Sequence, residues 1–79
     1  MKYPKVISVK PLSEYRLYVE WEDGKKGTFD CKPYLIGDWY GELLDNEKFF
    51  AVRPCGKTIE WENGQDIAPH ELYDYAISE

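Results

Sequence analysis

Hydrophobic and polar residues alternate along residues 15–22 of this chain, which read Tyr-Arg-Leu-Tyr-Val-Glu-Trp-Glu. In an extended chain, successive side chains point to opposite faces. One face therefore carries Tyr15, Leu17, Val19 and Trp21, and the other carries Arg16, Tyr18, Glu20 and Glu22. This period of two is typical of an antiparallel strand with one buried face. We therefore predict a strand here, with Trp21 pointing into the core.

The end of this run occurs twice. Residues 19–25 read Val-Glu-Trp-Glu-Asp-Gly-Lys and residues 59–65 read Ile-Glu-Trp-Glu-Asn-Gly-Gln. Asp-Gly and Asn-Gly after alternating residues favour a β-hairpin with a type I′ turn, in which glycine accepts a positive φ. We predict a hairpin at Gly24 and another at Gly64, with both tryptophans facing inward. A duplication would explain the two copies, and so would independent use of one hairpin sequence.

The remaining pattern completes an α+β chain. Strands are predicted at residues 6–9, 15–22, 27–31, 52–55, 58–62 and 65–68. Pro11 is expected to stop the first strand, and Asp38 and Asp45 to cap two short helices in the middle. Pro69 suits the first position of a C-terminal helix over residues 69–77. We predict a mostly antiparallel sheet of five or six short strands, with short middle helices and a C-terminal helix.

The size and composition predict a single domain over residues 1–79. So short a chain buries only about 60% of its unfolded surface. Its three tryptophans, three phenylalanines and seven tyrosines can still supply a dense core.

Charge and cysteine content indicate which partners and which cellular compartment suit this protein. The net charge is −5, and the basic residues form no cluster, which argues against direct binding to nucleic acid. An acidic surface suits solubility or a basic protein partner. We find no signal-peptide pattern and no apolar stretch of about 20 residues, so we expect a cytoplasmic protein that does not bind membranes. Cys31 and Cys55 are expected to be reduced thiols rather than a disulfide.

The residues that could carry chemistry are few. His70 is the single histidine, and its place after Pro69 predicts an exposed helix residue. A metal site needs three or four converging ligands. Asp66, His70, Glu71 and Asp74 are close in sequence, but an ordinary acidic helix surface is the favoured interpretation. Glycine-rich phosphate loops are absent. We expect no metal, no cofactor and no catalytic residue.

The two copies of the motif also carry outward-facing carboxylates, namely Glu20, Glu22, Glu60 and Glu62. These share one sheet face if the strands that carry them are neighbours. Crowded carboxylates can have raised pKa values suited to acid–base chemistry, although a solvated outer face is the favoured interpretation. Tyr18 and Tyr40 are the aromatic residues most expected at the surface. The predicted partner-binding set is these four glutamates with Tyr18 and Tyr40.

An ordered set of short motifs spans residues 5–73. It comprises Val6-x-x-Val9-x-Pro11, Leu17-x-Val19, Asp23-Gly24, Phe29-Asp30, Pro33-Tyr34-Leu35, Phe49-x-x-Val52, Ile59-x-Trp61, Asn63-Gly64-x-Asp66-Ile67-x-Pro69 and Leu72-Tyr73. This set resembles the small bacterial family catalogued as domain of unknown function 2442. The resemblance implies an α+β domain with no established activity. Some members carry a helix-turn-helix domain after this region, and others are encoded beside another small protein, which suggests antitoxin-like pairs.

Three functions follow as hypotheses. The first is a non-catalytic protein-interaction module, antitoxin-like or an adaptor, that docks another small protein through its acidic face or an exposed strand edge. The second is a small enzyme that uses the acidic sheet face with His70. The third is a transcription-regulatory module that acts through a separate DNA-binding subunit. Association of two copies of the chain into a homodimer is a further hypothesis.

Overall fold

The computed structural model describes residues 3–78, which form two antiparallel sheets and three short helices. The large sheet has the order β1-β2-β3-β6, with bounds Val6–Leu12, Arg16–Trp21, Lys26–Asp30 and Ile77–Ser78. The small sheet pairs β4, Arg53–Cys55, with β5, Thr58–Glu60. The helices are α1, Gly37–Gly41, α2, Asn46–Phe50, and α3, Pro69–Tyr75, and the single 3₁₀ turns are η1, Ser13–Tyr15, η2, Lys32–Tyr34, and η3, Glu42–Leu44. The α+β prediction is confirmed.

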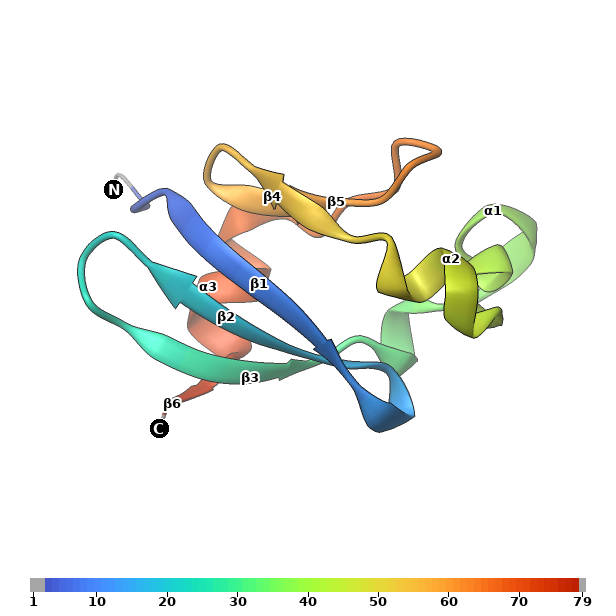
Figure 1. The fold of residues 1–79 in the computed structure, drawn as a ribbon, viewed down its shortest axis with the longest axis horizontal. Coiled ribbons are helices and arrows are strands. Elements are labelled where there is room, and N and C mark those ends of the chain that lie inside the picture. Colours follow the sequence, from blue (N-terminus) through green and yellow to red (C-terminus); the bar gives the residue numbers. More distant parts are fainter. Residues whose placement is uncertain (1–2, 79) are drawn as a thin grey trace.

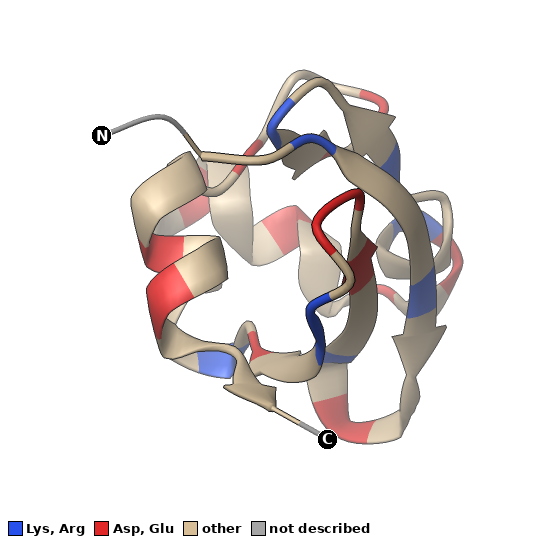
Figure 2. Cartoon of the chain, turned by 90° about the vertical axis from the view of Figure 1, so that its left-hand side faces the viewer, with Lys and Arg blue, Asp and Glu red and all other residues tan. Residues whose placement is uncertain are grey.

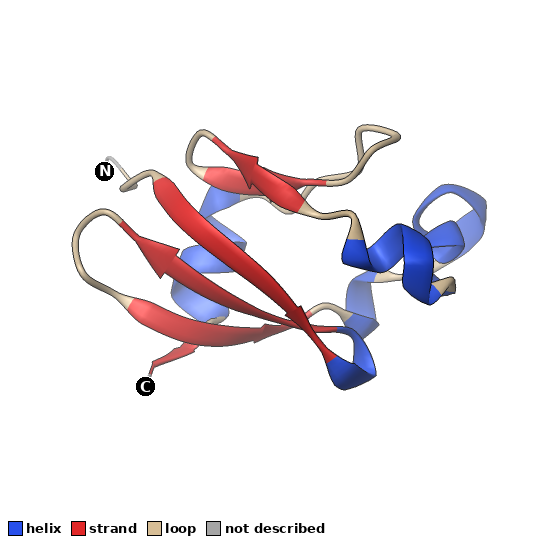
Figure 3. Ribbon diagram, in the orientation of Figure 1, coloured by secondary structure: helices blue, strands red, loops and turns tan. Residues whose placement is uncertain are grey.

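The elements are arranged around one core. The small sheet lies beside β1, α3 lies behind the large sheet, and α1 and α2 stand at the end of the molecule away from both termini (Figures 1 and 3). The predicted alternation in β2 holds, because Leu17, Val19 and Trp21 are at most 1% exposed. Trp61 is completely buried as well. Both tryptophans of the doubled motif therefore point inward, as predicted.

The two copies of the motif form the same loop. In the first loop, residues 21–25, the Trp21 N–H donates to Lys25 O at 2.9 Å and the Gly24 N–H donates to Trp21 O at 3.0 Å. The second loop, residues 61–65, repeats both bonds at 2.8 and 2.9 Å. Gly24 has φ +94° and Gly64 has φ +89°. The hairpin at Gly24 and the turn at Gly64 are therefore confirmed.

The turn type is corrected. A type I′ turn needs positive φ at both central residues, but in residues 3–78 Glu14 and Tyr15 are the sole non-glycine residues with positive φ. Asp23 and Asn63 are thus right-handed or extended. The loops contain three residues, a turn followed by a left-handed glycine bulge, because the tryptophan N–H bonds beyond the glycine.

Several predicted boundaries were wrong. β1 continues through Pro11, because β1 is an edge strand of the large sheet. A proline has no N–H to donate, and an edge strand accepts it because one of its sides forms no ladder in that sheet. Residues 65–68 form only one bridge, between Glu60 and Asp66. The sixth strand is instead Ile77–Ser78, since the chain becomes extended at Ala76 and α3 ends two residues before the predicted boundary.

The two predicted helix caps differ. Asp45 caps α2, because its side chain accepts a hydrogen bond from the Glu47 N–H at 3.0 Å. Asp38 does not cap α1; the helix begins at Gly37, and the cap position is held by Ile36, two residues before Asp38, with no side-chain cap bond. Asp38 therefore lies inside the first turn, where its charge still complements the N-terminal end of the helix.

The two cysteines are free thiols in different environments. Cys31 is fully buried and Cys55 is exposed. Burial raises the pKa of the Cys31 thiol, so it holds little of the reactive thiolate. We expect a thiol reagent to label one cysteine in the native protein and two in denaturant. Cys55→Ser should abolish native labelling, and equal labelling rates for both thiols of the native protein would contradict this burial.

Candidate functional site

The six predicted partner-binding residues lie on three elements, β2, α1 and β5, and in the two loops. Tyr18 and Glu20 are half-buried on the outer face of β2, and Tyr40 is half-buried in α1. The others belong to β5 and the two loops: Glu22, Glu60 and Glu62. β2 and β5 are in different sheets, with β1 and β4 between them. The supposition that the four glutamates share one sheet face was therefore wrong.

In both β2 and β5, a basic residue of the neighbouring strand lies opposite the glutamate. Glu20 is in register with Lys26 on β3. Glu60 on β5 forms an ion pair with Arg53 on β4 at 3.0 Å. The outer face of the large sheet therefore has mixed charge rather than an acidic field.

The acidic excess lies in the second half of the chain. Residues 1–32 contain seven Lys and Arg against five Asp and Glu, a net charge of +2. Residues 33–79, here called the acidic half, contain three Lys and Arg against ten Asp and Glu, a net charge of −7. In Figure 2 the strands of the large sheet carry both colours, whereas α3 carries only acidic residues. The acidic surface is thus formed by the middle helices, the second loop and α3.

The first loop binds helix α3 through the third and fifth residues of the loop, Asp23 and Lys25. The Asp23 carboxylate accepts a hydrogen bond from the Tyr73 hydroxyl at 2.5 Å. The Lys25 ammonium donates to the backbone carbonyl of Tyr73 and lies 4.1 Å from the centre of its ring. One side chain of the loop therefore binds the helix side chain, and the other binds the helix backbone.

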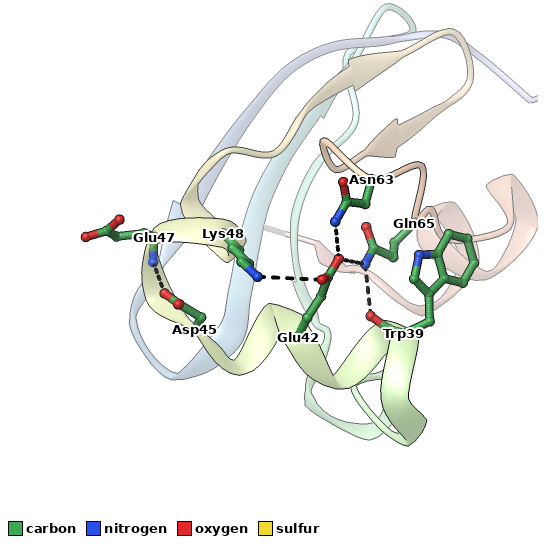
Figure 4. Close-up of polar contacts among 7 residues, drawn as sticks. All are labelled: Trp39, Glu42, Asp45, Glu47, Lys48, Asn63 and Gln65. Atoms are coloured by element: carbon green, nitrogen blue, oxygen red, sulfur yellow. Dashed lines mark hydrogen bonds and ion pairs between the residues drawn. The ribbon is translucent and has the colours of Figure 1, made fainter.

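The second loop repeats this arrangement on the middle helices. Asn63 donates to the Glu42 carboxylate at 2.6 Å, and Gln65 donates to the same oxygen at 2.5 Å and to Trp39 O at 2.9 Å (Figure 4). Lys48 lies 3.6 Å from the other Glu42 oxygen. Gln65 is completely buried, and its Oε1 has no hydrogen-bond partner within residues 3–78. The third and fifth residues of each copy thus bind another segment: α3 in the first copy, and α1 with η3 in the second.

The hydrogen bonds of the second loop stabilise the charged form of Glu42. The donors Asn63 and Gln65 lower the pKa of its carboxyl below the ordinary value of 4.5. A carboxyl with a lowered pKa in the folded state contributes stability above its unfolded pKa, and this contribution is lost as the pH falls through the folded pKa. We expect Glu42→Gln to lower the thermal midpoint at pH 7 and to have a smaller effect at a pH below the ordinary carboxyl value of 4.5. Thermal melts at the two pH values measure this difference.

Glu62→Gln is the matched control, because Glu62 is an exposed carboxylate of the second loop. It should change the midpoint little at either pH. An equal loss for Glu42→Gln at both pH values would contradict the proposed hydrogen-bonded carboxylate.

Two hollows are lined by residues of the middle helices and of the segment that follows β5. The smaller, of about 130 Å³, is lined by Glu42, Leu43, Lys48, Trp61, Glu62, Asn63 and Gln65. The larger, here called the groove, has a volume of about 370 Å³ and is lined by Tyr34, Tyr40, Asp66, Ile67, Ala68 and Glu71. The groove lies between the η2–α1 segment and the start of α3, and among residues 3–78 no basic residue lines it.

Hydrogen bonding and packing fix the tyrosines of the groove. The Tyr40 hydroxyl donates to Asp66 O at 2.9 Å. The Tyr34 ring packs on the buried Phe29 with ring centres 5.4 Å apart. Burial, and then the negative charge of Glu71, raises the pKa of the Tyr34 phenol. Tyr34 therefore stays neutral at physiological pH beside two carboxylates.

The residues considered for a metal site do not converge. Within residues 3–78, no group of three or more His, Cys, Asp and Glu side chains is arranged to hold a metal ion. His70 is exposed at the start of α3, as predicted. Asp66 and Glu71 line the groove, whereas Asp74 accepts a hydrogen bond from the Tyr3 hydroxyl at 3.1 Å. None of the helices in residues 3–78 has the length and apolar character needed to cross a membrane.

The fold and site define a small α+β domain in which a doubled hairpin loop fixes helices around an acidic groove. The chain belongs to the family described as protein of unknown function (DUF2442), whose model matches residues 6–78. This match confirms the resemblance and extends it through β6. Comparisons with curated proteins and with solved structures gave no match.

Proposed function

We propose that this chain is a non-catalytic protein-interaction module that docks another small, basic protein on its acidic half. The observation that carries the proposal is the division of charge, with a net −7 on residues 33–79 and a groove there whose two ionisable carboxylates have no basic neighbour in the lining. Complementary charge steers association and selects partners. An antitoxin-like or adaptor role would use such a surface.

Exposed apolar side chains lie in the same half. Ile36, Trp39, Leu44 and Phe50 are all about half exposed or more, and they come from one segment of 15 residues. Exposed aromatic side chains such as Trp39 and Phe50 commonly anchor protein interfaces. The middle helices thus offer apolar contacts beside the acidic groups that would select a basic partner.

The absence of a shared catalytic geometry supports the non-catalytic part of the proposal. Acid–base catalysis requires groups that converge on one reacting centre. Glu20 and Glu60 belong to strands of different sheets, and His70 is exposed at the start of α3. These groups do not form the concave acidic site that the enzymatic alternative requires.

Affinity capture tests this function. The tagged chain is incubated with an extract of the cells that naturally make it, and retained proteins are identified by mass spectrometry. The purified pair is then studied by calorimetry at low and high salt. We expect one small basic protein whose affinity falls as ionic strength rises, because exposed charges are screened beyond about 10 Å at 0.1 M salt. A chain that retains no protein, or an acidic partner whose affinity ignores salt, would contradict the proposal.

The exposed tryptophan of α1 gives a sharper prediction. Trp39→Ala should weaken the partner complex by about 2 kcal/mol, the size typical of an interface anchor. The free protein should lose much less stability, since the Trp39 ring is 52% exposed. Ile7→Ala is the control, because Ile7 is similarly exposed on β1 at 59% but lies outside the acidic half. Equal binding losses for the two variants, measured by calorimetry, would place the docking surface elsewhere.

A further inference from the structure

We propose that the groove receives an arginine side chain of the docked partner. This inference rests on the proposed function and names the group that the partner would insert. The groove combines two tyrosines, Tyr34 and Tyr40, with two carboxylates, Asp66 and Glu71. Ile67 and Ala68 complete its lining with apolar surface.

Within residues 3–78, the groove carboxylates form no ion pair with a basic side chain. The ion pairs found in residues 3–78 are Lys48 with Glu42 and Arg53 with Glu60. Neither pair includes Asp66 or Glu71, and the groove contains no basic lining residue. A cation from outside would therefore meet two negative charges without displacing an internal partner.

The position of the groove makes these groups reachable. Asp66 is exposed, and Tyr34, Tyr40 and Glu71 are half-buried rather than sealed in the core. Tyr40 is itself held in place, because its hydroxyl bonds to Asp66 O and the preceding residue, Trp39, is fixed through its carbonyl by Gln65. The groove is thus preformed and open at the surface.

The chemistry of the lining favours arginine over lysine. A guanidinium group is planar, stacks on aromatic rings and presents a fork of N–H donors that matches carboxylates. Tyrosine faces also attract cations through the ring quadrupole. A lysine ammonium would gain the charge interaction but neither the stacking nor the fork.

Small probes test the inference directly. The ¹⁵N-labelled chain is titrated with N-acetyl-arginine amide, N-acetyl-lysine amide and the uncharged N-acetyl-citrulline amide, and amide shifts are followed by NMR. We expect the arginine probe to shift the amides of Ile67, Ala68 and Glu71 and to bind more tightly than the lysine probe. Citrulline has nearly the same shape, so its binding should be at least about fivefold weaker through loss of charge. The absence of shifts at the groove, or equal binding of citrulline, would overturn the proposal.

Two further outcomes would also overturn the arginine assignment. One is lysine binding as tight as arginine binding. The other is equally tight binding of tetramethylammonium, which would indicate a site for free organic cations instead of a partner side chain.

Variants connect the probe to the partner. Asp66→Asn with Glu71→Gln should weaken the arginine probe by about tenfold while the thermal midpoint stays close to that of the wild type. Glu47→Gln, an exposed acidic residue outside the groove lining, should leave probe binding unchanged. The captured partner should bind the double variant more weakly than it binds the wild type. A partner that binds both equally would overturn the arginine anchor but leave the docking function standing, so the two proposals fail separately.

Discussion

Trp61→Ala is expected to unfold most of the protein at 25 °C. The Trp61 side chain is completely buried, packs on Phe49 with ring centres 5.8 Å apart, and donates its indole N–H to Phe49 O at 2.9 Å. Truncating a buried tryptophan to alanine costs about 3–5 kcal/mol. The orphaned carbonyl adds about 1 kcal/mol or more. A domain of this size is typically stable by only about 3–5 kcal/mol, so the loss is comparable to the whole free energy of unfolding.

Urea denaturation followed by circular dichroism measures this loss. Trp39→Ala is the matched control, because it removes the same atoms from a ring that is half exposed. It should cost less than about 1.5 kcal/mol. A folded Trp61→Ala variant as stable as the Trp39→Ala variant would show that the second loop is not anchored in the core.

Gly27→Ala is expected to detach the C-terminal strand from the large sheet. A Cβ at Gly27 would lie 2.8 Å from Ile77 O and 3.3 Å from the Ala76 Cβ. Backbone atoms cannot yield as a flexible side-chain end can, so β6 must move away from β3. Forcing extra carbon into such a contact costs about 1–3 kcal/mol.

Hydrogen exchange at the β3–β6 pairing, together with thermal melts, measures this effect. Gly41→Ala is the control, because a Cβ at Gly41 meets nothing within 4 Å and alanine is the better helix former. It should leave the midpoint unchanged or raise it. If Gly27→Ala melted with the wild type and kept β6 protected, the close approach of the two strands would be contradicted.

Local patterns explain why much of the fold was predictable. The alternation of β2 assigns Leu17, Val19 and Trp21 to the core because one face of a strand must be buried. The hairpin at Gly24 and the turn at Gly64 follow from residues that are adjacent in sequence. Each of these features depends on interactions within a few residues, which a sequence pattern records directly.

The wrong and missed features depend on contacts between distant residues. β6 forms because Gly27 allows Ile77 to approach, and neither residue has a pattern that indicates the other. The four-glutamate face required an adjacency of β2 and β5 that the insertion of β1 and β4 prevents. The left-handed Glu14 and Tyr15 were also missed, since neither residue type favours positive φ.

The groove was missed for the same reason. Tyr34 and Glu71 come together only through the packing of α3 against the η2–α1 segment. Two early signals pointed to it: Tyr40 was predicted as an exposed aromatic contact, and Asp66 and Glu71 belonged to a cluster that we considered as metal ligands and interpreted as an acidic helix surface. Their acidic character was recognised, but the tyrosines opposite them could not be placed from spacing alone.

The doubled motif connects this fold to the proposed function. The first loop fixes α3, which carries Glu71, and the second loop fixes α1, which carries Tyr40. The two copies therefore position the two helices that line the groove. Their shared sequence is structural, and its consequence is an acidic surface assembled between the helices that it holds.

We expect the acidic half, rather than the outer face of β2, to dock the partner. Two double variants with equal charge changes test it, Asp66→Lys with Glu71→Lys and Glu20→Lys with Glu22→Lys, after melts have shown both to be folded. Calorimetry with the captured partner should show a loss of about 100-fold or more for the first pair and less than about threefold for the second. Loss of binding with the second pair and retention with the first would show that the partner docks on the outer face of β2 instead.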